Sequence, residues 1–183
     1  MTGVQTCALP IYADSATFCL SKGLAAPIGS VVVGSGDFIW RARRARKLLG
    51  GGMRQVGVLA AAGLVALSDG PDGTVARLAE DHANARMLAE GLAGLSGVLS
   101  PGYIAQPVGE VLDPARVTTN FVLFKVDGDS DRRARFLSEL ERRGVLMVAY
   151  PHGQIRAVTH YGITAADITA TIAAAAAALH ATA

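Results

Sequence analysis

The chain has 183 residues, of which 51% are hydrophobic and 17% charged, so it can bury a core and does not have the composition of a disordered protein. Its net charge of +2 is too small to predict a nucleic-acid-binding protein. No apolar run reaches the roughly 18 residues needed to cross a bilayer, so no membrane partner is expected. Cys7 and Cys19 have neither CxxC spacing nor a matching histidine pattern. This argues against a disulfide framework and a zinc site, and makes the cytoplasm the default location.

The first twelve residues differ from the pattern that follows them. Met1–Ile11 (MTGVQTCALPI) has neither the basic start nor the long apolar stretch of a signal peptide. It also does not continue into the strand pattern that begins near Asp14. We therefore interpret residues 1–12 as an artefactual or non-native segment. We expect the natural protein to begin upstream, so that this chain represents its C-terminal part.

Two strands and two helices are expected next in the chain. Ser15–Leu20 (SATFCL) reads as a short buried strand, and Gly29–Gly34 (GSVVVG) as a second strand. Asp37 is the predicted N-cap of a helix that runs to Lys47 and stops at three consecutive glycines. The helix predicted over Gln55–Leu67 is apolar nearly all round, and is therefore expected to be buried or to lie at an interface.

A long amphipathic helix from Thr74 to about Leu95 is predicted to link two domains. The segment Gly94–Gly109 is rich in glycine, proline and serine, as expected of a boundary. The predicted division is therefore a first domain over 13–95, which includes the linking helix, and a small α/β domain over 96–183.

The second domain is predicted to follow a strand, helix, strand, strand, helix order. The predicted elements are strands over 118–126, 145–149 and 155–159 and a helix over 131–143. Thr164 precedes the final helix, with Asp167 at its third position, which is the pattern of a capping box.

Lys22 is the first candidate for chemistry, because it lies in Ser21-Lys22-Gly23 at the end of a predicted strand. A lysine that forms a Schiff base must be held rigidly and must lose its proton near neutral pH. The small residues around it would let a planar cofactor lie against the backbone. Without further context, however, a lysine at a strand end is normally a solvated surface residue.

Several ordered blocks give Lys22 that context. Asp14–Ser35 (DSATFCLSKGLAAPIGSVVVGS), Arg44–Gly63 (RARKLLGGGMRQVGVLAAAG) and Arg77–Asn84 (RLAEDHAN) together resemble the low-specificity L-threonine aldolase family. The resemblance extends from about Tyr12 onward and is strongest before Leu92. The sequence departs from the family pattern at Ala25, where we would expect glycine.

The resemblance implies an α/β fold of the fold-type-I class of pyridoxal 5′-phosphate enzymes. The chain would contain the C-terminal part of the large domain, followed by a small α/β domain. It further implies that Lys22 carries the cofactor, and that Lys47 and Arg54, on either side of the triple glycine, lie near its phosphate. Arg156, in the segment QIRAVTHY, would bind the substrate carboxylate, a task for which a guanidinium is well shaped. The competing interpretations are a helix-terminating glycine run and an outward-facing strand arginine.

The implied reaction is aldol cleavage of L-threonine or L-allo-threonine to glycine and an aldehyde, catalysed by a homotetramer. No convincing general base is found in the chain, and other cofactor-binding parts are expected upstream, so this chain alone is expected to be inactive. Two alternatives remain open. The protein could be another fold-type-I enzyme, such as a different β-eliminating lyase or a racemase, or the chain could be a non-catalytic oligomerisation fragment.

Overall fold

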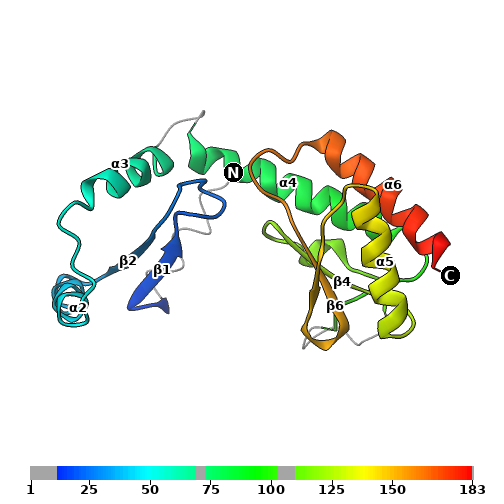
Figure 1. Ribbon diagram of the computed structural model, residues 1–183, viewed down its shortest axis with the longest axis horizontal. Helices are drawn as coiled ribbons and strands as arrows, with labels where there is room; N and C mark the ends of the chain where they lie inside the picture. Colours follow the sequence, from blue (N-terminus) through cyan, green and yellow to red (C-terminus); the bar gives the residue numbers. More distant parts are fainter. Residues whose placement is uncertain (1–11, 69–72, 103–109, 183) are drawn as a thin grey trace. The chain divides into compact units, whose positions relative to one another are not determined.

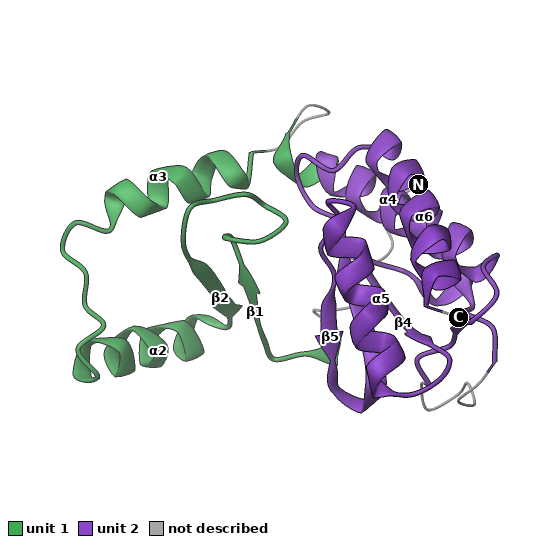
Figure 2. Ribbon diagram, turned by 45° about the vertical axis from the view of Figure 1, so that its right-hand side comes forward, with its two compact units in different colours: residues 1–76 green, residues 77–183 purple. Residues whose placement is uncertain are grey.

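The computed structural model describes residues 12–68, 73–102 and 110–182. The chain divides into two compact units, one ending at Ala76 and the other beginning at Arg77 (Figures 1 and 2). The segment interpreted as artefactual on sequence grounds lies, apart from Tyr12, outside the described residues. Within the described ranges, no helix is both long and apolar enough to cross a membrane.

The first unit is built on an antiparallel strand pair. Strand β1 (Ser15–Cys19) pairs with β2 (Ser30–Gly34), close to the predicted strand positions. Helix α2 (Gly36–Leu48) follows β2, and helix α3 (Gly57–Ala66) comes after the glycine run. The small core of this unit lies under the β1–β2 loop and consists of Leu20, Ala26 and Ala66.

Two predictions about these helices need correction or refinement. The N-cap of α2 is Ser35 and not Asp37, because the Ser35 hydroxyl accepts a hydrogen bond from the backbone N–H of Phe38 at 3.3 Å.

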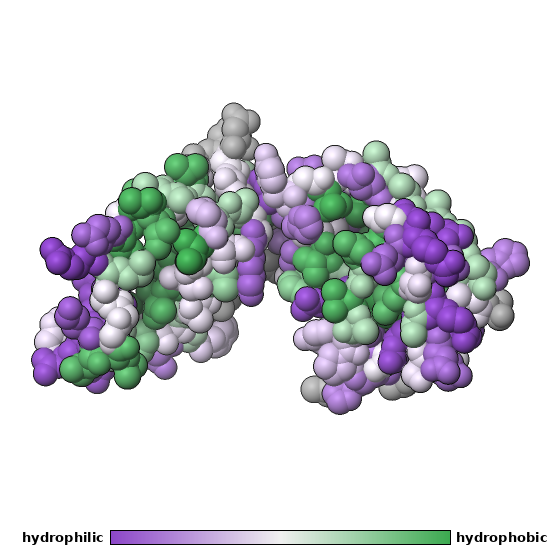
Figure 3. Space-filling model, viewed as in Figure 1, coloured by the Kyte–Doolittle hydropathy of each residue, from purple (hydrophilic) through white to green (hydrophobic). Residues whose placement is uncertain are grey.

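Helix α3 buries only Gly63 and Ala66 within this chain. Its larger side chains are open to solvent, with exposed fractions of 78% for Val58 and 73% for Leu64. Figure 3 shows the resulting apolar surface over α3. Among the described residues, α3 is therefore buried only at these two small positions.

The second unit contains a four-stranded antiparallel sheet with helices on one face (Figure 1). The strand order is β3-β4-β6-β5, and the chain order of the elements is α4 (Thr74–Ala93), β3 (Val98–Leu99), η1 (Pro114–Arg116), β4 (Phe121–Val126), α5 (Ser130–Arg142), β5 (Val148–Tyr150), η2 (Pro151–Gly153), β6 (Gln154–Val158) and α6 (Ala165–Ala181). This matches the predicted order of strands and helices, with β3 and the two short 3-10 helices added.

The core of the second unit lies between the sheet and its three helices. Alternate residues of β4 and β6 point into it, namely Val122, Phe124, Val126, Ile155 and Ala157. Phe124 and Phe136 meet edge to face, with ring centroids 6.3 Å apart. The side chains between the core-facing strand residues lie on the opposite face of the sheet from the three helices of this unit.

Helix α4 contributes one face to this core. Its buried apolar residues are Ala85, Leu88, Ala89 and Leu92. The N-terminal half of the helix is also held to the chain after β6. Asn84 donates to the carbonyl of Ile163 at 2.9 Å, and the Thr159 hydroxyl donates to the carbonyl of Asp81 at 2.6 Å. Sequence reasoning assigned this helix to the first domain as a linker, whereas its contacts lie in the second unit. The predicted domain boundary near residue 95 stays a prediction.

Helix α6 begins with the predicted capping box. The Thr164 hydroxyl accepts from the backbone N–H of Asp167, and the Asp167 carboxylate accepts from the backbone N–H of Thr164 at 2.8 Å and from its hydroxyl at 2.7 Å. These bonds from Thr164, its backbone N–H first, hold the pKa of Asp167 below its usual range.

Candidate functional site

Lys22 lies in the loop between β1 and β2, directly after the first strand. Backbone hydrogen bonds close this loop, from Leu20 N to Gly29 O at 2.9 Å and from Ala26 N to Leu20 O at 3.0 Å. The carbonyl of Lys22 accepts from the backbone N–H of Ala25 at 2.8 Å. The side chain of Lys22 is exposed. The loop therefore fixes the backbone of Lys22 while its amine stays accessible.

Ala25 explains why a glycine is expected in this loop. Its φ is 56°, in the left-handed region that residues with a side chain rarely adopt. This conformation directs the chain back so that Ala26 can bond to Leu20 and pack under the loop. Glycine adopts the same conformation without steric cost. The departure from the family pattern thus falls on a residue whose backbone geometry favours glycine.

Cys19 is the ionisable neighbour of Lys22. Its thiol accepts a hydrogen bond from the Ser30 hydroxyl at 3.5 Å across the strand pair. This bond, together with the positive charge of Lys22, lowers the pKa of Cys19. Cys19 is half-buried and lies at the end of β1, outside the small core of this unit.

Lys47 and Arg54 lie on either side of the triple glycine, and both are exposed. Lys47 is in the last turn of α2, which ends with hydrogen bonds from Gly50 N to Lys47 O and from Gly51 N to Arg46 O. The glycines therefore do terminate a helix. They also let a cation lie close to the backbone, because a Cβ on Gly52 would be 3.1 Å from Cδ of Lys47 and 3.4 Å from its Nζ. A cation beside a glycine-rich backbone is a combination suited to a phosphate group.

Arg156 lies on β6, on the sheet face opposite the three helices of the second unit. It pairs with Leu123 of β4 on one side and Val148 of β5 on the other. Its guanidinium carbon lies 5.6 Å from the ring centroid of Phe121 and 5.3 Å from that of Tyr150. Its Nε is buried and has no hydrogen-bond partner among the described residues.

The candidates are thus distributed over both units. Lys22, Lys47 and Arg54 belong to the first unit, and Arg156 belongs to the second. The contacts of Arg156 with Phe121 and Tyr150 could not be found from sequence. Both aromatic residues were visible within predicted strands or near them, but their approach to Arg156 depends on the order and register of three strands.

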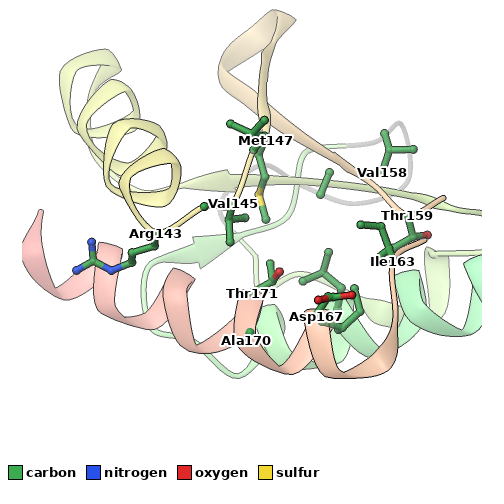
Figure 4. A pocket seen from close by; sticks show the side chains of 14 residues that line it. Arg143, Val145, Met147, Val158, Thr159, Ile163, Asp167, Ala170 and Thr171 are labelled. Atoms are coloured by element: carbon green, nitrogen blue, oxygen red, sulfur yellow. The ribbon is translucent and has the colours of Figure 1, made fainter. Parts of the chain in front are cut away.

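A pocket of about 350 Å³ lies in the second unit, on the helix side of the sheet. Its lining comes from the segment before β5, from β6 and from α6, and Met147, Thr159, Ile163 and Thr171 are among the labelled residues (Figure 4). None of the four predicted site residues lines it.

The histidines supply no visible catalytic base. His82, His152, His160 and His180 are all exposed. Nδ1 of His160 lies 2.9 Å from the carbonyl oxygen of Tyr161, a contact within its own loop. No group of three or more histidine, cysteine, aspartate or glutamate side chains able to hold a metal occurs in the described part of the chain.

Residues 2–126 match the family model described as "Beta-eliminating lyase". The chain is 41% identical over 171 residues to low-specificity L-threonine aldolase 1 of Arabidopsis thaliana, covering 93% of this chain and 43% of that protein. It is 42% identical over 154 residues to the low specificity L-threonine aldolase of Escherichia coli K12, covering 84% of this chain and 39% of that protein. The chain therefore spans about two fifths of the length of these relatives.

Solved structures with the same fold include serine palmitoyltransferase of Sphingomonas wittichii, with a TM-score of 0.67 and 13% identity over 96% of this chain and 42% of that chain. A candidate L-allo-threonine aldolase of Listeria monocytogenes aligns with a TM-score of 0.63 and 19% identity, over 94% of this chain and 45% of that chain. At these identities the likeness shows the fold alone. The fold-type-I class expected from the sequence is confirmed.

Proposed function

Since the chain belongs to the beta-eliminating lyase family, we propose that it is the C-terminal part of a pyridoxal 5′-phosphate-dependent lyase. The lyase would cleave L-threonine, L-allo-threonine and related β-hydroxy-α-amino acids to glycine and an aldehyde. The observation that carries the proposal is the 41% identity to a low-specificity L-threonine aldolase over 93% of this chain. The aligned region is long enough to include both units, so the likeness does not depend on one short motif.

The geometry of the first unit fits the proposed cofactor. Lys22 has a fixed backbone and an accessible amine, as a residue that carries the cofactor requires. Lys47 and Arg54 would neutralise the phosphate, with Lys47 already lying along the glycine backbone. When bound, pyridoxal 5′-phosphate supplies an electron sink for the negative charge that develops at Cα of the amino acid.

Arg156 would hold the amino-acid carboxylate. A guanidinium can donate two parallel N–H bonds to a carboxylate, which fixes the orientation of the substrate as well as its position. A fixed carboxylate in turn limits rotation about the bonds at Cα, so that the Cα–Cβ bond can be aligned for cleavage. The group that removes the β-hydroxyl proton is left unassigned.

The remaining expectations concern the whole protein. The apolar surface of α3 supports contact with another part of the full-length protein or with a second copy of it. By family resemblance, the assembly would be a homotetramer. We also retain the cytoplasm as the expected location. The 183-residue chain alone would be inactive, because it spans only about two fifths of the related aldolases.

Absorption spectroscopy of the full-length protein tests the cofactor assignment. The upstream reading frame is recovered, and the wild-type protein is compared with Lys22→Ala and with the control Lys125→Ala, which changes a lysine of the second unit. We expect a visible cofactor band in wild type and in Lys125→Ala, and none in Lys22→Ala. A band that persists in Lys22→Ala would show that Lys22 is not the cofactor-carrying residue.

A substrate panel tests the reaction. We expect glycine and acetaldehyde from threonine, with activity falling to background in Lys22→Ala. Racemisation of alanine, or elimination from a serine derivative with a β-leaving group, without cleavage of threonine would assign the protein to another reaction within the fold class. Full threonine cleavage by the 183-residue chain alone would contradict its proposed inactivity.

A further inference from the structure

The guanidinium of Arg156 lies between two aromatic rings that come from different strands. Phe121 belongs to β4 and Tyr150 to β5, and these two strands flank β6 on opposite sides. Phe121 pairs with Val158 and Tyr150 pairs with Gln154, so the rings stand at opposite diagonals of Arg156, on the sheet face opposite the helices of this unit. The ring centroids lie 5.6 Å and 5.3 Å from Cζ of Arg156, within the distance at which a ring attracts a cation.

The two rings hold the cation without using its hydrogen-bond donors. A ring attracts a guanidinium through its π face, whereas a carboxylate binds its N–H groups directly. Other arginines of this unit have carboxylate partners, such as Arg132, which binds Asp127 at 2.6 Å. Among the described residues, Arg156 has no carboxylate at ion-pair distance. The rings therefore stabilise its charge, and no carboxylate of the described residues occupies its terminal N–H groups.

Burial determines which donors an incoming carboxylate can reach. Nε of Arg156 is buried without a partner, so the available donors are those of the two terminal nitrogens. An arginine side chain that is free to rotate would lose conformational entropy when it binds a ligand. Contact with a ring on each side reduces that freedom before binding, and pre-organisation of this kind strengthens binding.

We infer that Phe121 and Tyr150 are positioning residues, which hold the Arg156 guanidinium in the orientation that binds the substrate carboxylate. This inference rests on the proposed function, because it takes Arg156 as the carboxylate-binding residue. Neither ring is required to touch the reacting atoms. Both rings remain partly exposed on the sheet face, with exposed fractions of 45% for Phe121 and 41% for Tyr150. The proposed positioning role would explain two large aromatic side chains at this exposed place.

Steady-state kinetics of the full-length, cofactor-loaded enzyme test the inference. Phe121→Leu and Tyr150→Leu each remove one ring and keep an apolar side chain. Because one cation–π contact at an exposed site is worth about 0.5–1 kcal/mol, each variant should raise KM for threonine about two- to fivefold with little change in kcat. Tyr150→Phe keeps the ring, and should restore most of the affinity lost in Tyr150→Leu.

The matched control is Tyr161→Leu. Tyr161 also stacks on an arginine, at 4.9 Å from Cζ of Arg77, but that arginine binds Asp81 at 2.8 Å. Removal of the Tyr161 ring should leave KM for threonine within about twofold of the wild-type value. Threoninamide, which lacks the carboxylate, is a second control. If the rings act through Arg156, Phe121→Leu and Tyr150→Leu should bind threoninamide as tightly as the wild-type enzyme does.

A measurement without cofactor examines the guanidinium itself. The apoprotein is treated with phenylglyoxal, and modification of Arg156 is followed by peptide mass spectrometry. Loss of either ring should increase the modification rate of Arg156 several-fold and leave that of the exposed Arg116 unchanged. An unchanged Arg156 rate together with an unchanged KM in both ring variants would overturn the inference.

Arg156→Lys separates this inference from the proposed function. If Arg156→Lys leaves KM for threonine unchanged, the carboxylate-binding role of Arg156 fails and the inference fails with it. If Arg156→Lys raises KM strongly while Phe121→Leu and Tyr150→Leu do not, only the positioning role of the rings is wrong.

Discussion

Ala25 combines a side chain with a backbone conformation that suits glycine. Its φ of 56° costs a residue with a Cβ about 1–2 kcal/mol, and glycine recovers part of this at the expense of a more flexible unfolded chain. Ala25→Gly is therefore expected to increase the free energy of unfolding by about 0.5–1 kcal/mol, measured by urea denaturation.

Ala26→Gly is the control for this substitution. Ala26 is buried under the same loop, and its φ is not in the left-handed region. The substitution removes buried apolar surface and adds flexibility, so it should be destabilising. If Ala25→Gly and Ala26→Gly changed the free energy of unfolding equally, the left-handed backbone at Ala25 would not be the cause of the effect there.

The start of α6 is an element-scale feature with a defined pH dependence. The pKa of Asp167 is lowered in the folded chain by the N–H and hydroxyl of Thr164. Asp167 therefore contributes stability above its unfolded pKa, and this contribution is lost as the pH falls through its folded pKa. We expect Asp167→Asn to lower Tm at pH 7, and the difference from wild type to shrink toward zero in acid.

Asp37→Asn provides the comparison for that pH series. It removes a negative charge from the first turn of α2, where the hydroxyl of Ser35 and not Asp37 makes the cap. Its effect on Tm at pH 7 should be smaller than that of Asp167→Asn. A Tm difference for Asp167→Asn that stays constant from neutral pH to acid would contradict the capping role of the carboxylate.

Elements with a strong local signal were well predicted. The capping residues of α6 were identified from four neighbouring residues, because a capping box is a contact between neighbours in the chain. The cap of α2 was misplaced by two residues, since both Ser35 and Asp37 are good N-caps and only the backbone conformation decides between them. The two-residue strand β3 was missed because so short a strand has no periodicity of its own.

At the scale of the whole second unit, helices α4 and α6 pack closely at Gly91. A Cβ on Gly91 would lie 2.6 Å from Cγ1 of Ile172 and 3.1 Å from its Cγ2. Alanine is favoured over glycine by about 1 kcal/mol inside a helix, but overpacking typically costs about 1–3 kcal/mol. We expect Gly91→Ala to lower the free energy of unfolding, because the packing cost exceeds the gain in helix propensity.

A double-mutant cycle with Ile172→Ala tests the cause of that loss. If the clash with Ile172 is responsible, Gly91→Ala should be much less harmful in the Ile172→Ala background, giving a favourable coupling energy of at least about 0.5 kcal/mol. If Gly91→Ala stabilises wild type by the propensity difference, the two helices are not packed as closely as described.

The sequence by itself determined the order and type of most elements, the family and the candidate residues Lys22, Lys47, Arg54 and Arg156. The elements depend on local periodicity and turn chemistry, whereas the family and the candidate residues depend on the resemblance of ordered motifs to a known family. Both can be read without knowing what lies across the fold. The family resemblance led us to expect glycine at position 25, where the structure has a left-handed backbone.

Only the tertiary structure decided which residues meet across the second unit. It packed α4 onto the second unit, formed a pocket that none of the predicted site residues lines, and brought Phe121 and Tyr150 to opposite sides of Arg156. The physical reason is that strand order and register are set by packing between segments distant in sequence, and a shift of one residue would turn every side chain of a strand to the other face. Strand order and register therefore cannot be read from the local sequence.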